Sequence, residues 1–362
     1  MRLPLILTLC ALPAGAMALD TAAGAVTVTK VAGGLEQPWG VAALPSGALL
    51  VTERDGRLVL VEDGRGARVV GTPRVSARGQ GGLLDITLAR NFATTRTLFL
   101  TYSKPQQGGS GTAMAAAELS ADGRRLENLR DLFVSAPGGS GGRHYGSRVV
   151  EAPDGTLYVT IGDRGDRPSA QDRALHNGSI VRVNRDGTVP ADNPFVGQDG
   201  VLPEIWSYGH RNPQGAGLDA DGTLWTAEHG ARGGDEVNRI AKGANYGWPV
   251  ISYGVHYSGA RIGEGMAQDG MEQPAMYWDP SIAPSGLLVY QGDMFPEWRG
   301  DMFVGSLKFD YIARVKMSGD SAREVEQIQG AETGRVRDIV EDSDGSILFI
   351  SVAEGAVYRI TR

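Results

Sequence analysis

The sequence predicts an all-β fold, a six-bladed β-propeller with four-stranded antiparallel blades. The first observation is a phrase that recurs six times, a turn followed by a strand of alternating apolar and polar residues. The second is the composition, because 52 glycines and only 7% aromatic residues are typical of short strands joined by tight turns. The third is the placement of the two ends. A lone strand at 25–31 and a last repeat that ends almost at Arg362 would let the N-terminal strand complete the last blade.

The repeats follow one another along the whole chain. Their first expected strands are 48–52, 97–102, 156–161, 223–227, 301–306 and 346–352, and further strands follow at 57–62, 179–184, 311–317 and 356–360. Asp-Gly or Ser-Gly between two alternating runs is a hairpin signal. The irregular stretch 245–284, rich in Gly, Tyr and Pro, is interpreted as an insertion on the functional face of the ring. A pair of β-sandwiches is the structural alternative, but six related units fit it poorly.

Residues 1–18 are predicted to be a cleavable signal peptide. The apolar run 3–12 follows Arg2, and Ala16-Met17-Ala18 has the spacing of a cleavage site. The run is too short to span a bilayer. We therefore expect a periplasmic or secreted protein without stable membrane insertion, in which residues 19–362 form one propeller domain. The sole cysteine, Cys10, lies in this segment, so the mature chain would have no disulfide and no thiol nucleophile.

His144 stands in a glycine-rich loop directly before a predicted hairpin. The strand 149–151, the turn 152–155 and the strand 156–161 follow it, and Asp163 lies just after the second strand. Because a hairpin brings its two ends together, we expect Asp163 to lie near His144. A carboxylate that accepts a hydrogen bond from one imidazole nitrogen fixes the tautomer and leaves the other nitrogen as a base. The alternative is a capping or core histidine beside an unrelated loop aspartate.

Cationic residues are informative here because the whole chain is acidic, with a net charge of −7. That charge argues against a nucleic-acid-binding face. Lys308 ends one predicted strand, and Arg335 and Arg337 open the last blade with their side chains expected on the same side. Since strands from separate blades converge at the axis, these residues and Arg211 would form one pocket for a compact polyanion. The alternative is four unrelated surface cations.

Other motifs are excluded by their details. Asp219, Asp221, Asp342 and Asp344 stand beside glycines but do not complete an EF-hand, so they are predicted to be turn residues. The glycine-rich stretch 138–142 is no dinucleotide fingerprint, because its glycine order is wrong and no helix is expected after it. The sequence also contains no G-x-S-x-G nucleophile elbow.

Three motifs are specific in combination. They are Gly-His-Arg-Asn-Pro-Gln-Gly at 209–215, Gly-Gly-Asp-Glu-Val-Asn at 233–238 and Asn-Tyr-Gly-Trp-Pro at 245–249. Together they resemble the soluble quinoprotein dehydrogenases of the glucose/sorbosone dehydrogenase group, and within it the bacterial aldose sugar dehydrogenases. The resemblance covers residues 37–339, most of the mature chain. It implies a six-bladed propeller that holds pyrroloquinoline quinone (PQQ) and calcium and oxidises the C1 hydroxyl of aldose sugars to lactones.

The resemblance also implies roles for individual residues. His144 matches the general base, and Asp163 matches the carboxylate that orients it. The residues that match those around the cofactor are Gln80, Arg211, Asn212, Tyr257, Lys308, Arg335 and Arg337. The backbone carbonyls of Gly230 and Ala231 match the ligands of the cofactor-bound calcium ion, although several relatives have proline in place of Ala231. Glu236 and Tyr246 match part of a second calcium site.

The implied chemistry agrees with the charge pattern. PQQ carries three carboxylates, which would explain a cluster of cations in an acidic chain. Calcium would polarise the C5 carbonyl as a Lewis acid, while His144 removes the hydroxyl proton and hydride moves from C1 to C5. The sequence has no haem-attachment motif, so electrons would leave to an external acceptor, a quinone or a redox protein.

Two other classes of function are considered. A six-bladed propeller with a central calcium ion can be a lactonase or esterase, which would need acidic and amide side chains around the metal. A non-catalytic propeller could bind a partner or a glycan without any cofactor. A lactonase or esterase is disfavoured by the cationic residues Lys308, Arg335 and Arg337. A non-catalytic propeller is disfavoured because the chain has these cations together with His144.

Overall fold

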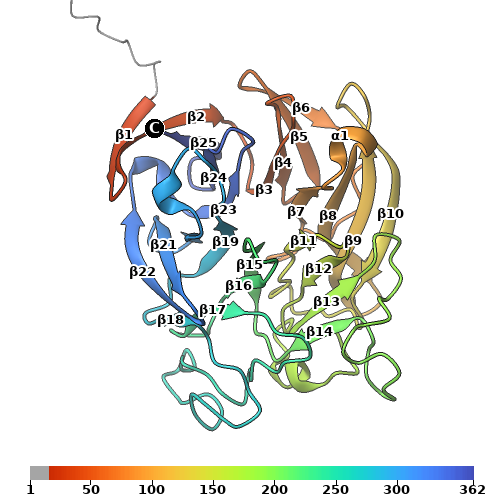
Figure 1. Cartoon of the computed structure of the whole chain (residues 1–362). Coiled ribbons are helices and arrows are strands. Elements are labelled where there is room, and N and C mark those ends of the chain that lie inside the picture. The colour runs from red at the N-terminus through yellow and green to blue at the C-terminus, as the bar shows by residue number, and fades with distance from the viewer. Residues whose placement is uncertain (1–15) are drawn as a thin grey trace, which may run out of the picture.

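The computed structural model describes residues 16–362, which form six antiparallel sheets arranged as a ring (Figure 1). The predicted six-bladed β-propeller is confirmed. Residues 1–15, which hold most of the expected signal peptide, lie outside the described residues. The expected cleavage point after Ala18 falls within strand β1 (Ala16–Thr21).

Each of the first five blades is one sheet whose four strands follow one another in the chain. The first two blades contain β3 (Pro38–Ala43), β4 (Leu49–Glu53), β5 (Arg57–Glu62), β6 (Arg65–Val69), β7 (Leu83–Leu88), β8 (Thr97–Gln106), β9 (Gly109–Leu119) and β10 (Leu126–Val134). The next two contain β11 (Val149–Glu151), β12 (Leu157–Thr160), β13 (Ser179–Val183), β14 (Ile205–Tyr208), β15 (Pro213–Leu218), β16 (Leu224–Glu228), β17 (Asp235–Arg239) and β18 (Met276–Trp278). The fifth contains β19 (Pro284–Val289), β20 (Met302–Ser306), β21 (Ile312–Ser318) and β22 (Ser321–Ile328). Helical residues in the described part of the chain are limited to α1 (Phe92–Thr95) and the 3₁₀ turns Arg167–Gln171, Pro296–Trp298 and Ala331–Thr333.

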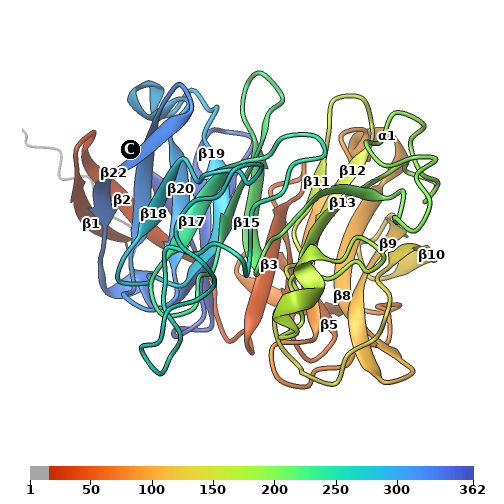
Figure 2. The same cartoon turned by 90° about the horizontal axis from the view of Figure 1, so that it is seen from below.

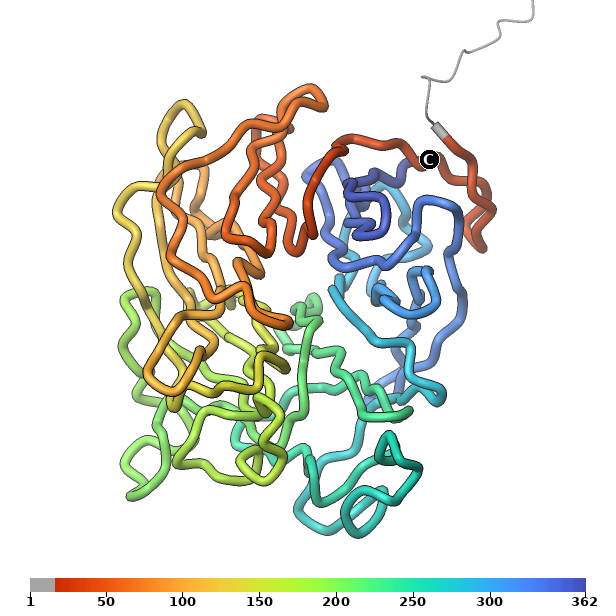
Figure 3. Tube along the Cα trace, turned by 180° about the vertical axis from the view of Figure 1, so that it is seen from behind, coloured from red at the N-terminus to blue at the C-terminus, as the bar shows by residue number. Residues whose placement is uncertain are grey.

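The last blade closes the ring with both ends of the chain. Its strand order is β1, β2 (Gly24–Ala32), β25 (Ala356–Thr361), β24 (Ile347–Ser351) and β23 (Val336–Glu341). In the antiparallel pairing of β2 with β25, Val28 lies opposite Ile360. Figure 3 shows the N-terminal and C-terminal traces side by side at this point. The predicted closure is confirmed, but this blade has five strands, because β1 folds back on β2.

Apolar residues of facing blades form the core, and the first strand of each blade packs around the axis. The cluster between the first two blades joins Leu50 and Leu60 to Leu100 from the neighbouring sheet. The innermost strands β3, β7, β11, β15, β19 and β23 each contact the next one around the ring. Glycine is required where they approach most closely. A Cβ added at Gly286 would lie 2.7 Å from the Oδ1 atom of Asp338 on the adjacent strand.

The tight turns are held by short polar side chains, as predicted for the Asp-Gly positions. Oδ1 of Asp219 accepts hydrogen bonds from the backbone N–H groups of Asp221 at 3.0 Å and Thr223 at 2.9 Å. Gly222 in the same turn has a φ of +81°, which an L-residue adopts only with strain. Asp219 therefore serves the backbone of its turn.

One face of the ring gathers the loops that carry the predicted site. Because strands alternate in direction, the loop before each innermost strand and the loop after each second strand reach the same face (Figure 2). The long segment between β17 and β18, which includes most of the predicted insertion, also reaches it. Its Trp248 donates a hydrogen bond to Asp163 at 2.8 Å. In the described part of the chain no helix is long and apolar enough to cross a membrane.

Candidate active site

His144 and Asp163 lie at the two ends of the hairpin β11–β12, and they are in contact. Val149 pairs with Val159 and Glu151 with Leu157, which sets the register of the hairpin. The His144 Nδ1 atom lies 2.6 Å from Asp163 Oδ1. The predicted proximity of the two residues is therefore confirmed.

Both side chains are fixed by their surroundings. Besides its contact with His144, Asp163 accepts hydrogen bonds from Gly165 N at 2.7 Å and from Trp248 Nε1 at 2.8 Å. His144 has a φ of +53°, and its backbone N–H donates to Gln80 Oε1 at 2.7 Å. A left-handed, hydrogen-bonded backbone at a histidine is a strained position that the surrounding loops must hold.

The electrostatic environment keeps this histidine neutral. Burial lowers the pKa of His144 below its ordinary value, and the cations Arg211 and Arg143 lower it further, although the Asp163 hydrogen bond raises it. Burial would raise the pKa of Asp163, but its hydrogen bond and charge interaction with His144 hold that pKa below the usual range. An ionised Asp163 accepts the Nδ1–H, so Nε2 of a neutral His144 carries a free lone pair.

A cavity of about 520 Å³ beside this pair is lined by four cations. They are Arg54, Lys308, Arg335 and Arg337, and none of the described lining residues is Asp or Glu. Burial and the neighbours Arg148, Arg335 and Arg54 lower the pKa of Arg337 to about 9. The predicted grouping of Lys308, Arg335 and Arg337 is confirmed, and such a cavity favours an anion with several negative charges.

The expectation that Arg335 and Arg337 both lie in the first strand of the last blade was wrong. Arg335 does not belong to the strand, because β23 begins at Val336 and Arg335 has a φ of +49°. Its backbone N–H donates to Asp310 Oδ1 at 2.8 Å, which holds it in the loop. Both side chains reach the same cavity, Arg335 from the loop and Arg337 from the strand.

Arg211 lies in an adjoining cavity, apart from the other three predicted cations. That cavity, of about 460 Å³, is lined by Gln80, Arg143, His144, Asp163, Gly165, Arg167, Arg211 and Tyr257. Gln80 lines both cavities, so they meet at its side chain. Tyr257 is 71% exposed and stands at the rim. Asn212 is buried, and its Oδ1 accepts the Gly146 N–H at 3.0 Å, which fixes the His144 loop from below.

Among the lining residues of the cationic cavity that were not predicted, Arg54 and His229 carry ionisable side chains. Arg54 follows β4 and donates its Nε to Gly81 O at 3.3 Å. His229 follows β16, and its buried Nε2 has no hydrogen-bond partner among the described residues. Burial and the nearby cations Arg211 and Arg337 lower the pKa of His229 to about 3, so this imidazole is neutral. The only sequence signal for either residue is its place directly after a second strand.

Arg148, near the axis of the ring, connects the innermost strands of several blades. Arg148 Nη1 contacts Asp85 at 2.8 Å and Asp338 at 2.6 Å, and Arg148 Nε donates to Gln214 O at 2.7 Å. The second oxygen of Asp338 accepts the Val41 N–H at 3.0 Å. Arg148 directly precedes β11, and its partners lie on β7, β15 and β23, while Val41 lies on β3. One polar network therefore links five blades. No pattern in the sequence indicates this convergence.

The predicted metal ligands lie next to these cavities. Gly230 N donates to Asp235 Oδ1 at 2.8 Å, whereas no described residue donates a hydrogen bond to the carbonyl oxygens of Gly230 and Ala231.

The residues predicted for a second calcium site, Glu236 and Tyr246, line a small hollow of about 20 Å³ together with Glu228. Burial and the Glu228 charge raise the pKa of Glu236 to about 8, while the Tyr246 hydroxyl donates to Arg239 O at 2.5 Å. In residues 16–362, no group of three or more His, Cys, Asp or Glu side chains could hold a metal ion.

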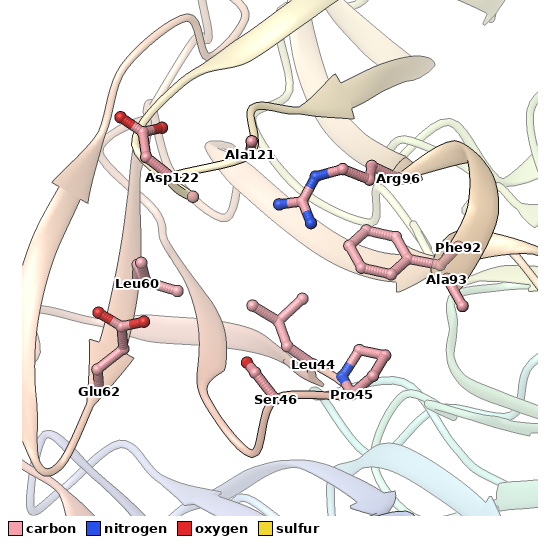
Figure 4. A pocket seen from close by; sticks show the side chains of 11 residues that line it. Leu44, Pro45, Ser46, Leu60, Glu62, Phe92, Ala93, Arg96, Ala121 and Asp122 are labelled. Carbon is pink, nitrogen blue, oxygen red and sulfur yellow. The ribbon is translucent and has the colours of Figure 1, made fainter.

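A separate cavity of about 310 Å³ lies between the first two blades, at the opposite ends of their strands (Figure 4). Leu44, Leu60, Glu62, Phe92 and Arg96 are among its lining residues. The Arg96 guanidinium is already engaged, because its Nε donates to Leu119 O at 2.6 Å and its Nη2 to Ser120 O at 2.5 Å. None of the predicted site residues lines this cavity.

Comparison with known proteins agrees with the geometry. The sequence model of the glucose/sorbosone dehydrogenase family matches residues 35–359. The chain is 40% identical to the aldose sugar dehydrogenase YliI of Escherichia coli, over 92% of each chain. The crystal structure of the soluble aldose sugar dehydrogenase from Escherichia coli in the apo-form matches with a TM-score of 0.89 at 39% identity, covering 93% of this chain and 99% of that one. The PQQ-bound aldose sugar dehydrogenase of Streptomyces coelicolor matches with a TM-score of 0.78 at 27% identity, covering 93% and 98%. The chain therefore belongs to the glucose/sorbosone dehydrogenase family.

Proposed function

We propose that this protein oxidises the C1 hydroxyl of aldose sugars to lactones, with PQQ and calcium as its cofactors and an external quinone or redox protein as electron acceptor. One observation carries the proposal. The neutral His144, held by Asp163, faces a cavity that meets a second cavity lined by four cations. A base beside a polyanion site suits a dehydrogenase whose oxidant is a carboxylated quinone.

The residues fit PQQ. Its three carboxylates would be matched by Arg54, Lys308, Arg335 and Arg337, which have no carboxylate among the described residues of their cavity. The buried Nε of Arg211 and Nε2 of His229 have no partner in the described structure. Buried polar atoms cost free energy unless they are paired, so both are suited to contact a ligand. We assign Gln80, Asn212 and Tyr257 to the walls of the proposed PQQ site.

The backbone carbonyls fit calcium. Calcium prefers oxygen ligands, and the carbonyl oxygens of Gly230 and Ala231 have no donor among the described residues. We assign both as ligands of a calcium ion beside the cofactor. For Glu236 and Tyr246 we propose a second calcium site in the small hollow that they share with Glu228. A cation there would compensate the like charges of Glu228 and Glu236, which both line that hollow.

The chain's own groups would handle the proton. The free lone pair of His144 Nε2 would accept the proton of the C1 hydroxyl, and the buried Asp163 carboxylate would stabilise the imidazolium that results. Trp248 and Gly165 would keep Asp163 in place during that charge change. When bound, PQQ supplies the two-electron acceptor and calcium supplies Lewis-acid polarisation.

A reconstitution experiment tests the proposal. Purified protein is mixed with PQQ and calcium, and the quinone absorbance is followed as glucose is added. The proposal predicts that glucose bleaches the quinone only when both PQQ and calcium are present. Activity with NAD and without quinone, or ester hydrolysis with calcium alone, would overturn it. We also propose that residues 1–18 are removed as a signal peptide, which N-terminal sequencing of the exported protein would test.

A further inference from the structure

The cavity in front of His144 carries more positive charge than a neutral sugar requires. Arg143, Arg167 and Arg211 line it, and Asp163 is its one carboxylate among the described lining residues. Three guanidinium charges therefore face one carboxylate charge. The whole chain has a net charge of −7, so this positive field is local to the cavity.

The Asp163 carboxylate compensates only part of this positive charge, and its hydrogen-bonding capacity is already used. It has no exposed surface, and its two oxygens accept hydrogen bonds from His144, Gly165 and Trp248. Within residues 16–362, none of the three arginines forms a salt bridge with any carboxylate. Arg143 and Arg167 are therefore left available to a substrate, whereas Arg211 is assigned to the cofactor.

Each arginine is held in a different way. Arg143 is exposed, and its side chain lies along Gly165, where an added Cβ would meet Nε at 2.7 Å. Arg167 Nη1 donates to His256 Nδ1 at 2.6 Å. Arg211 is buried, and its Nη1 donates to His229 O at 3.1 Å while its Nε has no partner among the described residues.

The positions along the cavity differ as well. Arg211 is buried in the wall of the cavity, whereas Arg143 is exposed and Arg167 is half-buried. Arg143 precedes His144 in its loop, and Arg167 lies on the 3₁₀ turn Arg167–Gln171. A sugar with C1 at His144 would therefore direct its far end toward Arg143 and Arg167.

We propose that the preferred substrate is an aldose with a carboxylate remote from C1, that is, a uronic acid. This inference rests on the proposed function. Guanidinium groups bind a carboxylate through paired, charge-assisted hydrogen bonds, which a neutral hydroxymethyl group cannot form equally well. The reaction is the same two-electron oxidation of the C1 hydroxyl to a lactone, with PQQ as the oxidant, and the remote carboxylate stays unchanged.

Kinetics with the PQQ- and calcium-loaded protein test the substrate class. We expect kcat/KM for glucuronate and galacturonate to exceed that for glucose and galactose by about tenfold or more, with the ratio falling as salt is added. Arg143→Gln and Arg167→Gln should each lower the uronate-to-glucose ratio at least severalfold. Arg323→Gln, the same change at an exposed position of the outer strand β22, should leave the ratio as it is. Equal ratios in all four proteins would overturn the inference while leaving the proposed function in place.

A binding experiment gives a readout that needs no turnover. Methyl glucuronoside and methyl glucoside have a blocked C1, so calorimetry on the loaded protein measures binding alone. We expect the glucuronoside to bind about tenfold more tightly, and Arg143→Gln to remove the difference. A preference for glucose 6-phosphate over both uronates would overturn the uronic acid assignment. If Arg143→Gln and Arg167→Gln change only the KM for an anionic electron acceptor, the two arginines bind that acceptor and the inference is overturned. If no sugar bleaches the quinone, the proposed function fails, and this inference fails with it.

Discussion

The Nδ1 atom of His144 lies 2.6 Å from Oδ1 of Asp163, a carboxylate with no exposed surface. This contact joins the two ends of one hairpin, so it depends on the turn at 152–155 and on the register of β11 against β12. It determines which imidazole nitrogen carries the proton. The chemistry proposed for the site depends on that tautomer.

Replacing His144 with glutamine should separate catalysis from binding. Neither PQQ nor calcium is assigned to the imidazole, so both should still bind, while turnover falls by about 10²–10⁴-fold. In the wild-type protein, activity should be lost as pH falls through the pKa of His144, because an imidazolium cannot accept a proton. That pKa lies below the ordinary value, so the loss should occur below about pH 6.5.

The measurement is the rate of sugar-dependent bleaching per mole of bound PQQ. A structural histidine would instead lower thermal stability and PQQ retention together, with the rate per bound PQQ intact. A rate within about threefold of wild type, well inside the loss expected for a base, would remove His144 from the mechanism.

Replacing Asp163 with asparagine should lower turnover less than replacing His144 does, because Asp163 acts through the imidazole. It should also change the response of stability to acid. The folded-state pKa of Asp163 is depressed, so its contribution to stability is complete above the unfolded pKa of about 3.9 and is lost as pH falls through the lower folded value. Urea unfolding between pH 3 and 7 should show a shallower acid loss in Asp163→Asn. Parallel curves for the two proteins would contradict the assigned hydrogen bond between His144 and an ionised Asp163.

Replacing Arg337 with alanine should weaken PQQ binding by about 1.5–3 kcal/mol, the value of a charge-assisted hydrogen bond. This corresponds to about 10- to 150-fold in Kd. The unloaded protein should lose little stability, because removing one of several neighbouring cations relieves repulsion. Fluorescence titration with PQQ measures the first effect. The matched control is Arg96→Ala in the distant cavity, which should leave the titration unchanged.

Replacing Arg148 with methionine should destabilise the whole ring. The change leaves Asp85 and Asp338 buried and facing each other without their cation, which costs about 3–5 kcal/mol for a broken buried pair. Denaturant unfolding measures this loss. The exposed pair of Arg299 and Asp293 is the control, and its removal should cost no more than about 1 kcal/mol. Equal losses for the two pairs would show that the axial network does not hold the blades together.

Removing calcium should abolish activity and lower thermal stability. The proposed ligands Gly230 and Ala231 act through backbone carbonyls, so Ala231→Pro should bind calcium within a few-fold of wild type. The measurement is calcium titration of PQQ-loaded protein after treatment with a chelator. A large loss of calcium affinity in Ala231→Pro, in a variant with a wild-type melting temperature, would contradict ligation by that carbonyl.

Local patterns in the sequence predicted most of the fold. A turn with glycine and the alternation that follows it are short-range signals, so the strands near 57–62 and 356–360 lie where they were expected. The contact between His144 and Asp163 was predictable for the same reason, since one hairpin joins them. The fifth strand of the last blade was missed because β1 overlaps the segment that was assigned to the signal peptide.

Contacts between blades were harder to predict. Arg148 touches Asp85, 63 positions away, and Asp338, 190 positions away, and nothing near Arg148 in the chain indicates either partner. His229 and Arg54 are similarly ordinary in sequence and become site residues only when loops from separate blades meet. Arg335 was assigned to the correct cavity, but strand alternation was the wrong reason, because its backbone is left-handed.

The pairing of β2 with β25 has a consequence for biosynthesis. A nascent chain that has emerged as far as residue 330 contains five complete blades but lacks β23 to β25, so β2 is paired with β1 alone and its other edge is open. Arg335 and Arg337 are still missing from the cationic cavity at that stage. The last thirty or so residues therefore complete both the ring and the cavity proposed to hold the cofactor, and a polypeptide that stops early would present an open edge where aggregation can begin.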